Sequence, residues 1–142
     1  MYKKILVALD HTAADQSLLS HIEPLAKLHG SQLTLVHVAD GWGARYYREL
    51  QLVESEEMKD DQAYLDATAN RLRQAGIPCT TLLALGDPPT EILKTVDEVQ
   101  CDLIAMTTHG HRLLGDILFG STIEYVRHRA TVPLLIVRAQ KQ

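Results

Sequence analysis

Apolar residues follow two different spacings along the chain. Four short runs are apolar at most positions, and a fifth, residues 31–38, alternates before it becomes continuous. Between these runs lie segments in which apolar residues recur every three or four positions. The runs predict strands that are covered on both faces of a sheet, and the periodic segments predict amphipathic helices. The predicted strands cover residues 4–9, 31–38, 80–85, 102–107 and 133–137. The predicted helices cover residues 13–28, 62–74, 90–99 and 121–129.

The alternation of strand and helix predicts an α/β fold. Right-handed crossovers between successive strands give an open parallel sheet of five strands with helices on both faces. The chain has 142 residues, which is enough for one domain to bury a core without disulfides or a structural metal. We therefore expect a single domain that spans residues 1–142.

One segment fits neither spacing. Residues 40–61 begin with Gly41-Trp42-Gly43 and contain Tyr46 and Tyr47 within a mixed-charge sequence that has no sustained period. A loop of this length in a compact domain usually has a function or is disordered. Its aromatic side chains could form a lid or a partner surface, or could fold back over the core, and the sequence does not favour one of these.

Charge and composition narrow the classes of partner. The chain has 14 Lys and Arg against 18 Asp and Glu, a net charge of -4, and no basic stripe interleaved with aromatic residues, which argues against nucleic acid. No apolar stretch approaches the roughly 20 residues of a membrane helix, and the N-terminus has no secretory pattern. We expect a cytoplasmic protein without a membrane partner. Cys79 and Cys101 stand alone, so neither a metal site nor a redox motif is predicted.

The most informative stretch, residues 106–122, joins a predicted strand to a predicted helix. Gly110 and Gly120 would let a ligand approach the main chain, and a helix starting at Ser121 would direct its free N–H groups at an anion. This pattern outlines a phosphate site. The same residues also fit a capping box, in which Ser121 and Glu124 satisfy the helix start without any ligand.

The spacing of the glycines is more specific than their presence. Nine residues separate Gly110 from Gly120-Ser121, which resembles the signature G-x-x-G-(nine residues)-G-S/T of the universal stress protein family. The resemblance covers the whole chain, through the opening Lys-Ile-Leu-Val-Ala-Leu-Asp, the strand end Leu-Val-His-Val, the Gly-Asp-Pro step and the closing Val-Pro-Leu-Leu-Ile-Val. The first glycine of the signature falls on Thr107, whose branched side chain could crowd the sugar of a nucleotide or hydrogen-bond to it.

This resemblance implies a strand order, a site and a ligand. The order 3-2-1-4-5 opens a crevice between Asp10 and the loop of residues 106–110, and the implied ligand is an adenine nucleotide, ATP, ADP or AMP. Any Mg²⁺ or Mn²⁺ would arrive with the phosphates, because the chain has no carboxylate cage of its own. The residues implied at the base and ribose are Ala8, Leu9, Asp10, Val38, Met106 and Thr107. Those implied at the phosphates are Gly110, Gly120, Ser121 and Thr122.

Two of these residues have ordinary alternatives that the sequence leaves open. Asp10 ends the first predicted strand, where it could equally be a turn residue or the N-cap of the following helix. Val38 ends the second predicted strand and could simply be part of the core.

The resemblance implies a stress-response regulator or sensor that binds an adenine nucleotide and hydrolyses ATP slowly at most. The alternative is a nucleotide-free dimeric scaffold for a protein partner, which Thr107 favours and the retained Gly110, Gly120 and Ser121 disfavour. An enzyme has less support, because the chain has no G-x-x-x-x-G-K-[ST] loop and no evident nucleophile paired with a general base. We predict no catalytic residues.

The final predicted strand, residues 133–137, also predicts a homodimer. In the order 3-2-1-4-5 it lies at the sheet edge, and only Pro133 blunts an otherwise apolar edge. The family resemblance points the same way, toward two final strands that run antiparallel across a two-fold axis.

Overall fold

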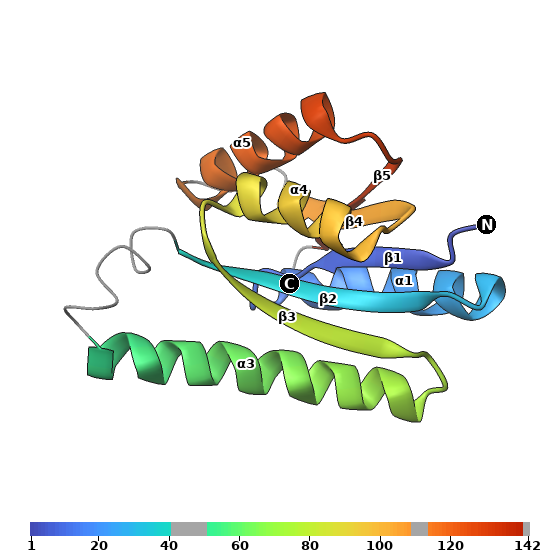
Figure 1. The fold of residues 1–142 in the computed structure, drawn as a ribbon, viewed down its shortest axis with the longest axis horizontal. Helices are drawn as coiled ribbons and strands as arrows, with labels where there is room; N and C mark the ends of the chain where they lie inside the picture. Colours follow the sequence, from blue (N-terminus) through green and yellow to red (C-terminus); the bar gives the residue numbers. More distant parts are fainter. Residues whose placement is uncertain (41–50, 109–113, 141–142) are drawn as a thin grey trace.

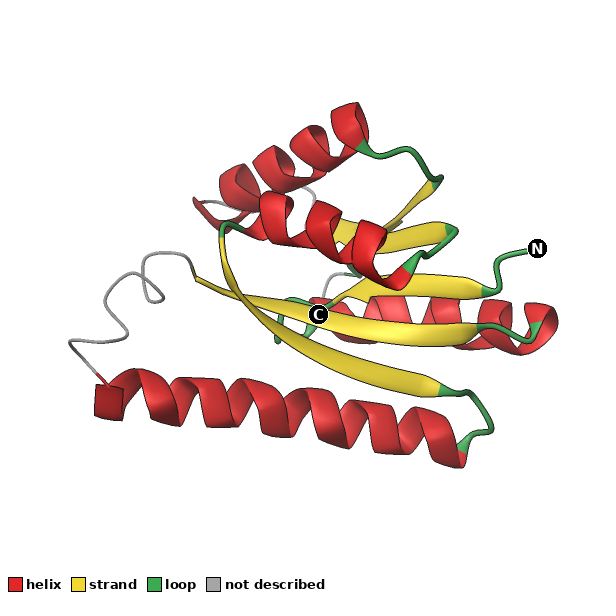
Figure 2. Ribbon diagram, viewed as in Figure 1, coloured by secondary structure: helices red, strands yellow, loops and turns green. Residues whose placement is uncertain are grey.

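The computed structural model describes residues 1–40, 51–108 and 114–140, without the side chains of residues 40, 51–55 and 114–121. Its strands and helices alternate along the chain (Figures 1 and 2). The strands are β1 Lys4–Ala8, β2 Gln32–Asp40, β3 Cys79–Gly86, β4 Leu103–Thr108 and β5 Leu134–Arg138. The helices are α1 Ala14–His29, α3 Gln51–Gln74, α4 Pro88–Val99 and α5 Leu114–Arg129.

The five strands form one parallel sheet in the order β3-β2-β1-β4-β5. This confirms the predicted fold class and strand order. β1 lies at the centre, where Ile5 to Val7 pair with Leu103 to Ala105 of β4. The pairing of β1 with β2 extends further along the chain, since the Leu9 N–H donates to the Val36 carbonyl at 2.8 Å. β1 and β4 therefore part at the carboxyl end of the sheet while β1 and β2 stay together.

Two cores, one on each face of the sheet, explain the unbroken apolar runs. Alternate residues of β1 point to opposite faces, so Ile5 and Val7 pack with α1 and α3 while Leu6 and Ala8 pack with α4 and α5. Figure 1 shows α4 and α5 side by side on one side of the sheet and α3 running along β3 on the other. A polar residue within β1 would thus lie in one core or the other.

α3 begins much earlier than its apolar spacing predicts. The predicted loop of residues 40–61 is wrong over residues 51–61, which belong to α3, and Asp40 ends β2. Residues 56–59 are Glu, Glu, Met and Lys, which are strong helix formers, but none of these four is buried, so they form no apolar stripe that periodicity could detect. In Figure 1 the first turns of α3 extend past the end of β3. Residues 41–50, with Trp42 and the two tyrosines, lie outside the described residues.

α5 also begins earlier than predicted. The helix starts at Leu114, about two turns before Ser121. The prediction of a capping box at Ser121 is therefore wrong, and so is the prediction that a helix start at Ser121 directs free N–H groups at an anion. The glycines suggested a loop up to Gly120, but a glycine inside a helix costs only about 1 kcal/mol relative to alanine. Leu114, Ile117 and Leu118 have the spacing of a helical stripe that continues into Val126. The helical spacing of the apolar residues is therefore a better guide to α5 than its glycines are.

Among the helices of the described residues, none is both long enough and apolar enough to cross a membrane.

Candidate functional site

A crevice opens at the carboxyl end of the sheet, where β1 and β4 part. Successive connections leave these two strands toward opposite faces, which is where open parallel sheets bind ligands. The residues that line the crevice are Ala8, Leu9, Asp10, Val36, His37, Val38, Pro88, Ile92, Met106, Thr107 and Thr122. Most of the predicted site residues are therefore neighbours in space, although they come from β1, β2, β4 and α5.

The remaining predicted residues belong to the glycine signature. Gly110 lies outside the described residues. Gly120 and Ser121 lie in α5 next to Thr122, which lines the crevice, but their surroundings are not described. The ligand contacts of all these residues remain predictions.

The polar end of the crevice is built from Asp10 and Thr107. The Thr107 hydroxyl donates to Oδ2 of Asp10 at 3.2 Å, which joins the ends of β1 and β4 beyond their last backbone pair. Thr107 is only 4% exposed, so its side chain belongs to the wall of the crevice. The N-cap of α1 is Ala13, so the interpretation of Asp10 as an N-cap is wrong.

Asp15, which the sequence analysis did not single out, holds the loop after β1. Its carboxylate is fully buried and accepts the N–H groups of Asp10 at 2.8 Å and His11 at 2.9 Å. His11 has φ +61°, a left-handed backbone that few residues other than glycine adopt without strain. A signal for Asp15 did exist, since it is a charged residue on the apolar stripe of α1 beside Leu18 and Leu19.

Tyr64 of α3 contacts both Asp15 and His11. Its hydroxyl donates to Oδ2 of Asp15 at 2.6 Å, and its ring stacks on His11 with 4.1 Å between centroids. Burial, and after it the hydrogen bond to the Asp15 carboxylate, raises the pKa of Tyr64. Tyr64 therefore remains a protonated donor at physiological pH.

His11, His37 and Asp61 form a second link between α3 and the strand ends. Nδ1 of His11 lies 2.7 Å from Oδ1 of Asp61, and Nε2 of His37 lies 3.5 Å from the same oxygen. Nδ1 of His37 also donates to the Leu9 carbonyl at 2.8 Å. His37 thus has a structural part in the crevice wall.

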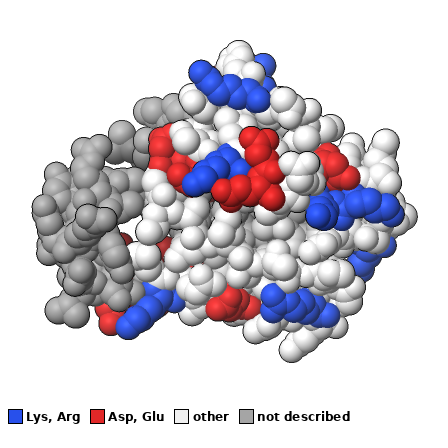
Figure 3. Space-filling model, viewed as in Figure 1, with Lys and Arg blue, Asp and Glu red and all other residues white. Residues whose placement is uncertain are grey.

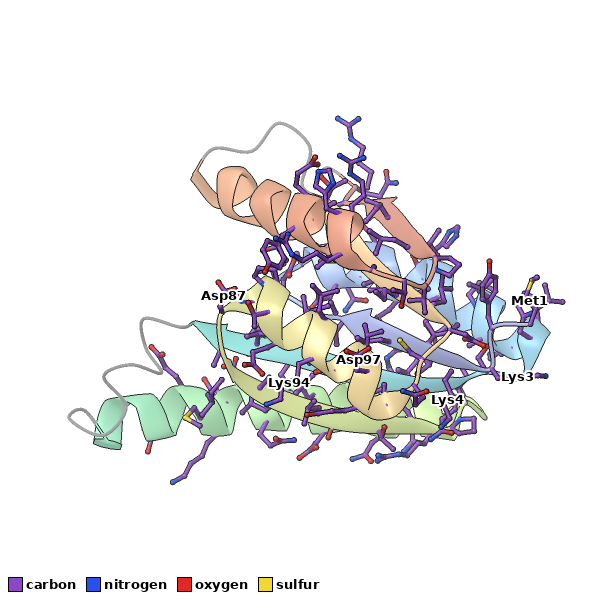
Figure 4. The ribbon with its side chains drawn as sticks, turned by 45° about the horizontal axis from the view of Figure 1, so that its top comes forward. Met1, Lys3, Lys4, Asp87, Lys94 and Asp97 are labelled. Atoms are coloured by element: carbon purple, nitrogen blue, oxygen red, sulfur yellow. The ribbon has the colours of Figure 1, made fainter. Side chains whose placement is uncertain are left out.

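The start of α4 forms the opposite wall. Asp87 is its N-cap and accepts the Thr90 hydroxyl at 2.6 Å, and Figure 4 shows Asp87 at the far end of the molecule from Lys3. Pro88 and Pro89 occupy the first helical positions and have no N–H. α4 therefore offers fewer free donors to an anion than most helix starts.

The possible metal ligands and the two cysteines in the described part of the chain form no reactive cluster there. No group of three or more His, Cys, Asp or Glu side chains there could hold a metal ion. Both cysteines are buried and free, and burial raises the pKa of the Cys79 thiol to about 11 and also raises that of Cys101. A raised pKa lowers the fraction of each thiol that is present as the thiolate at neutral pH.

Charged side chains of both signs are interspersed on the face shown in Figure 3, and its described part carries no continuous basic stripe. On the described residues of α4, Lys94 lies between Glu91 and Glu98 in sequence and 4.0 Å from Oε1 of Glu98.

Comparison with known proteins gives one consistent family. Residues 1–138 match the universal stress protein family. Universal stress protein MJ0577 of Methanocaldococcus jannaschii is 26% identical over 158 aligned positions, which cover 97% of this chain and 96% of that protein. The solved structure of MJ0577 aligns with a TM-score of 0.84 over 100% of this chain and 99% of that chain.

Two further solved structures have the same fold at lower identity. One is a universal stress protein in complex with cAMP, 19% identical, with a TM-score of 0.70 and 98% of each chain covered. The other is the universal stress protein from Archaeoglobus fulgidus in complex with dAMP, 24% identical, with a TM-score of 0.67 and coverage of 96% and 98%. At these identities the likeness shows the shared fold alone.

Proposed function

The chain belongs to the universal stress protein family, and on this premise we propose that it binds an adenine nucleotide in the crevice between β1 and β4. In this proposal the nucleotide makes the protein a regulator or sensor of the stress response. Two structural neighbours that bind cAMP and dAMP support the class of ligand.

The observation that carries the proposal is the division of the crevice into an apolar wall and one polar end. Val36, Val38, Ile92 and Met106 offer apolar surface suited to the faces of a purine. The hydrogen-bonded pair of Asp10 and Thr107 lies at the strand ends, where it can meet the polar sugar. An apolar pocket with a few convergent polar groups is the usual form of a small-molecule site.

In this proposal the phosphates lie at Gly110, Gly120, Ser121 and Thr122, where the hydroxyls of Ser121 and Thr122, and not the start of α5, would be the donors. The start of α4, which also lines the crevice, is a poor alternative because its two prolines lack N–H donors. Mg²⁺ or Mn²⁺ would bind through the phosphates and not through a protein cage. We also propose that the protein hydrolyses ATP slowly at most.

Calorimetry tests nucleotide binding directly. The protein is unfolded, stripped of carried-over ligand, refolded and titrated with ATP, ADP and AMP, with GTP as the matched control. We expect saturable heat with at least one adenine nucleotide and weaker binding of GTP. If no adenine nucleotide gives heat at millimolar concentration, the scaffold alternative replaces this proposal.

We also propose that the protein is a homodimer joined through β5. Within the described sheet, β5 pairs with β4 on one side only, which leaves its other edge available to a further strand. Ile136 is 36% exposed on this strand, which leaves apolar surface for a second copy. This edge is also the observation that favours the alternative function, a scaffold whose protein partner pairs with β5.

A further inference from the structure

His37 of β2 has an acceptor atom in front of each of its two ring nitrogens. Nδ1 lies 2.8 Å from the carbonyl oxygen of Leu9, which can accept a hydrogen bond but cannot donate one. Nε2 lies 3.5 Å from Oδ1 of Asp61, a carboxyl oxygen that comes from α3. A neutral imidazole has a single N–H, so it can donate to only one of these two oxygens.

The Leu9 carbonyl decides where that single hydrogen lies. In a neutral His37 the hydrogen must be on Nδ1, and the lone pair of Nε2 then faces the carboxylate of Asp61. In a protonated ring, Nε2 carries a hydrogen as well, and both contacts are attractive. The arrangement in the structure therefore matches a ring that holds one proton more than neutral imidazole.

His11 contacts the same carboxylate without this conflict. Its Nδ1 lies 2.7 Å from Oδ1 of Asp61, and its Nε2 has no acceptor among the described residues. A neutral His11 with its hydrogen on Nδ1 satisfies this contact. The two rings meet edge to face with 6.1 Å between their centroids, so a positive charge on both would be repulsive. His37 is thus the ring whose contacts depend on an added proton.

The surroundings of His37 suit a positive ring. Its side chain is 15% exposed and that of Asp61 is 17% exposed, so water and salt screen the pair less than they would on the open surface. β3 faces His37 with the apolar Leu83. The titratable groups on the other elements around it are Asp61 and Tyr64 of α3, Asp10 and His11 of the loop after β1, and Asp15 of α1. Three of them are carboxylates, which attract a positive charge.

Asp61 also lies at the point where α3 leaves the core. The described side chains before it, residues 56–60, are exposed or half-buried. Leu65, one turn after Asp61, is the first fully buried residue among the described side chains of this helix. The contacts of Asp61 with His11 and His37 therefore hold α3 beyond the part that the core anchors.

We propose that His37 and Asp61 form a proton-operated link between α3 and the wall of the crevice. Protonation of His37 adds the contact with Asp61 to the contact with Leu9, and both His37 and Leu9 line the crevice. Loss of the proton removes the attraction to Asp61, so the beginning of α3 separates from the strand ends more often. Acid closes the link, and a rise in pH through the histidine range, about pH 5 to 8, opens it. This inference concerns the protein without nucleotide.

Amide hydrogen exchange of the nucleotide-free protein at about pH 5.5 and about pH 8 tests the link. The rates of the α3 amides of residues 57–64 are corrected for the intrinsic pH dependence of exchange and are expressed relative to those of α4. Asp61→Asn keeps the shape of the side chain and removes its charge. His37→Asn can keep a donor to the Leu9 carbonyl and removes the ring nitrogen that faces Asp61. Asp60→Asn and His21→Gln, at exposed positions of α3 and α1, are the matched controls.

We expect wild-type residues 57–64 to be about fivefold better protected at the acid pH, which is the effect of one partly screened ion pair. The two control variants should keep this difference. Asp61→Asn and His37→Asn should remove it, because protection at the acid pH falls to its level at the higher pH. Circular dichroism confirms that each variant is folded.

Equal protection of the wild type at both pH values would overturn the inference, and so would a difference that persists in Asp61→Asn or in His37→Asn. If neither variant folds, wild-type NMR decides, because the C2–H resonance of His37 and the α3 amides must then follow one pH curve, and two separate curves would overturn the link. All measurements are made without nucleotide. Failure here therefore leaves the proposed function standing, and failure of nucleotide binding leaves this inference standing.

Discussion

Glu91 lies so close to Gly86 that a Cβ added at Gly86 would be 3.0 Å from Oε1 of Glu91. Gly86 also has φ +140°, a backbone that L residues rarely adopt, and it connects β3 to α4 at the crevice wall. We expect Gly86→Ala to lower the free energy of unfolding by about 1–3 kcal/mol through backbone strain, because the Glu91 side chain can move aside. Urea unfolding followed by circular dichroism measures the loss.

Gly30→Ala is the control for this change. Gly30 has φ +64° and open space around its Cα, so alanine there should cost about 1 kcal/mol. Equal losses at the two positions would mean that the unusual φ of Gly86 does not matter.

The buried carboxylate of Asp15 should be important for stability. Asp15→Ala leaves two backbone N–H groups and the Tyr64 hydroxyl without their acceptor, and we expect a loss of about 2 kcal/mol or more. Tyr64→Phe removes only one donor and should cost about 1 kcal/mol. Asp60→Ala, at an exposed position of α3, should be neutral. A stable Asp15→Ala variant would show that water or another group replaces the carboxylate.

Alkaline pH should weaken the folded protein through Tyr64. The pKa of Tyr64 is raised above its ordinary value of 10.0, so the folded state holds this proton more tightly than the unfolded chain does. The contribution is complete below pH 10 and is lost as the pH rises above it toward the folded pKa. We expect stability to fall more steeply above pH 10 in the wild type than in Tyr64→Phe. Parallel curves for the two proteins would contradict the raised pKa.

Gly120→Val tests the predicted phosphate contact. A valine is tolerated inside a helix such as α5, so circular dichroism should show an unchanged fold, but its side chain would occupy the predicted phosphate position. We expect ATP binding to be lost. Gly115→Val places the same side chain earlier in the same helix and should bind ATP normally. Wild-type affinity in Gly120→Val would mean that the phosphates bind elsewhere.

The β5 edge should control the oligomeric state. Ile136→Lys places a charge on the exposed apolar strand, and light scattering should shift from about twice the 15.8 kDa chain mass toward the chain mass itself. Leu28→Lys changes an apolar residue that is 79% exposed on α1 and should leave the mass unchanged. A wild-type protein that is monomeric at high concentration would reject the β5 dimer.

The sheet could be predicted because its strand residues are apolar for a single reason, which is burial in the core. Ile5, Leu6 and Val7 are apolar in succession since both faces of β1 are covered, and a run this short favours a buried strand over a helix. The starts of α3 and α5 could not be predicted in the same way. Residues 51–61 form helix without an apolar stripe, and Gly120 lies within α5 where the pattern indicated a loop.

The position of the crevice could be predicted because it lies where two strands end. Asp10 and Thr107 each follow or end an apolar run, and parallel strands bring their carboxyl ends to one edge. Asp15 and Tyr64 are 49 positions apart and meet only because α1 and α3 share a face of the sheet. Pair contacts of this kind leave no local pattern, which is why the support behind Asp10 had to come from the structure.

The central place of β1 has a consequence for how the protein is made. β1 is the first strand to leave the ribosome, and its partner β4 begins only at Leu103. Almost a hundred further residues are therefore synthesised before the β4-facing edge of β1 can be covered. During that interval β1, β2 and β3 can assemble with one apolar edge open, which is the form of nascent chain that chaperones bind. We therefore expect misfolding or aggregation of the nascent chain to be most frequent when translation stalls before residue 103, where β4 begins.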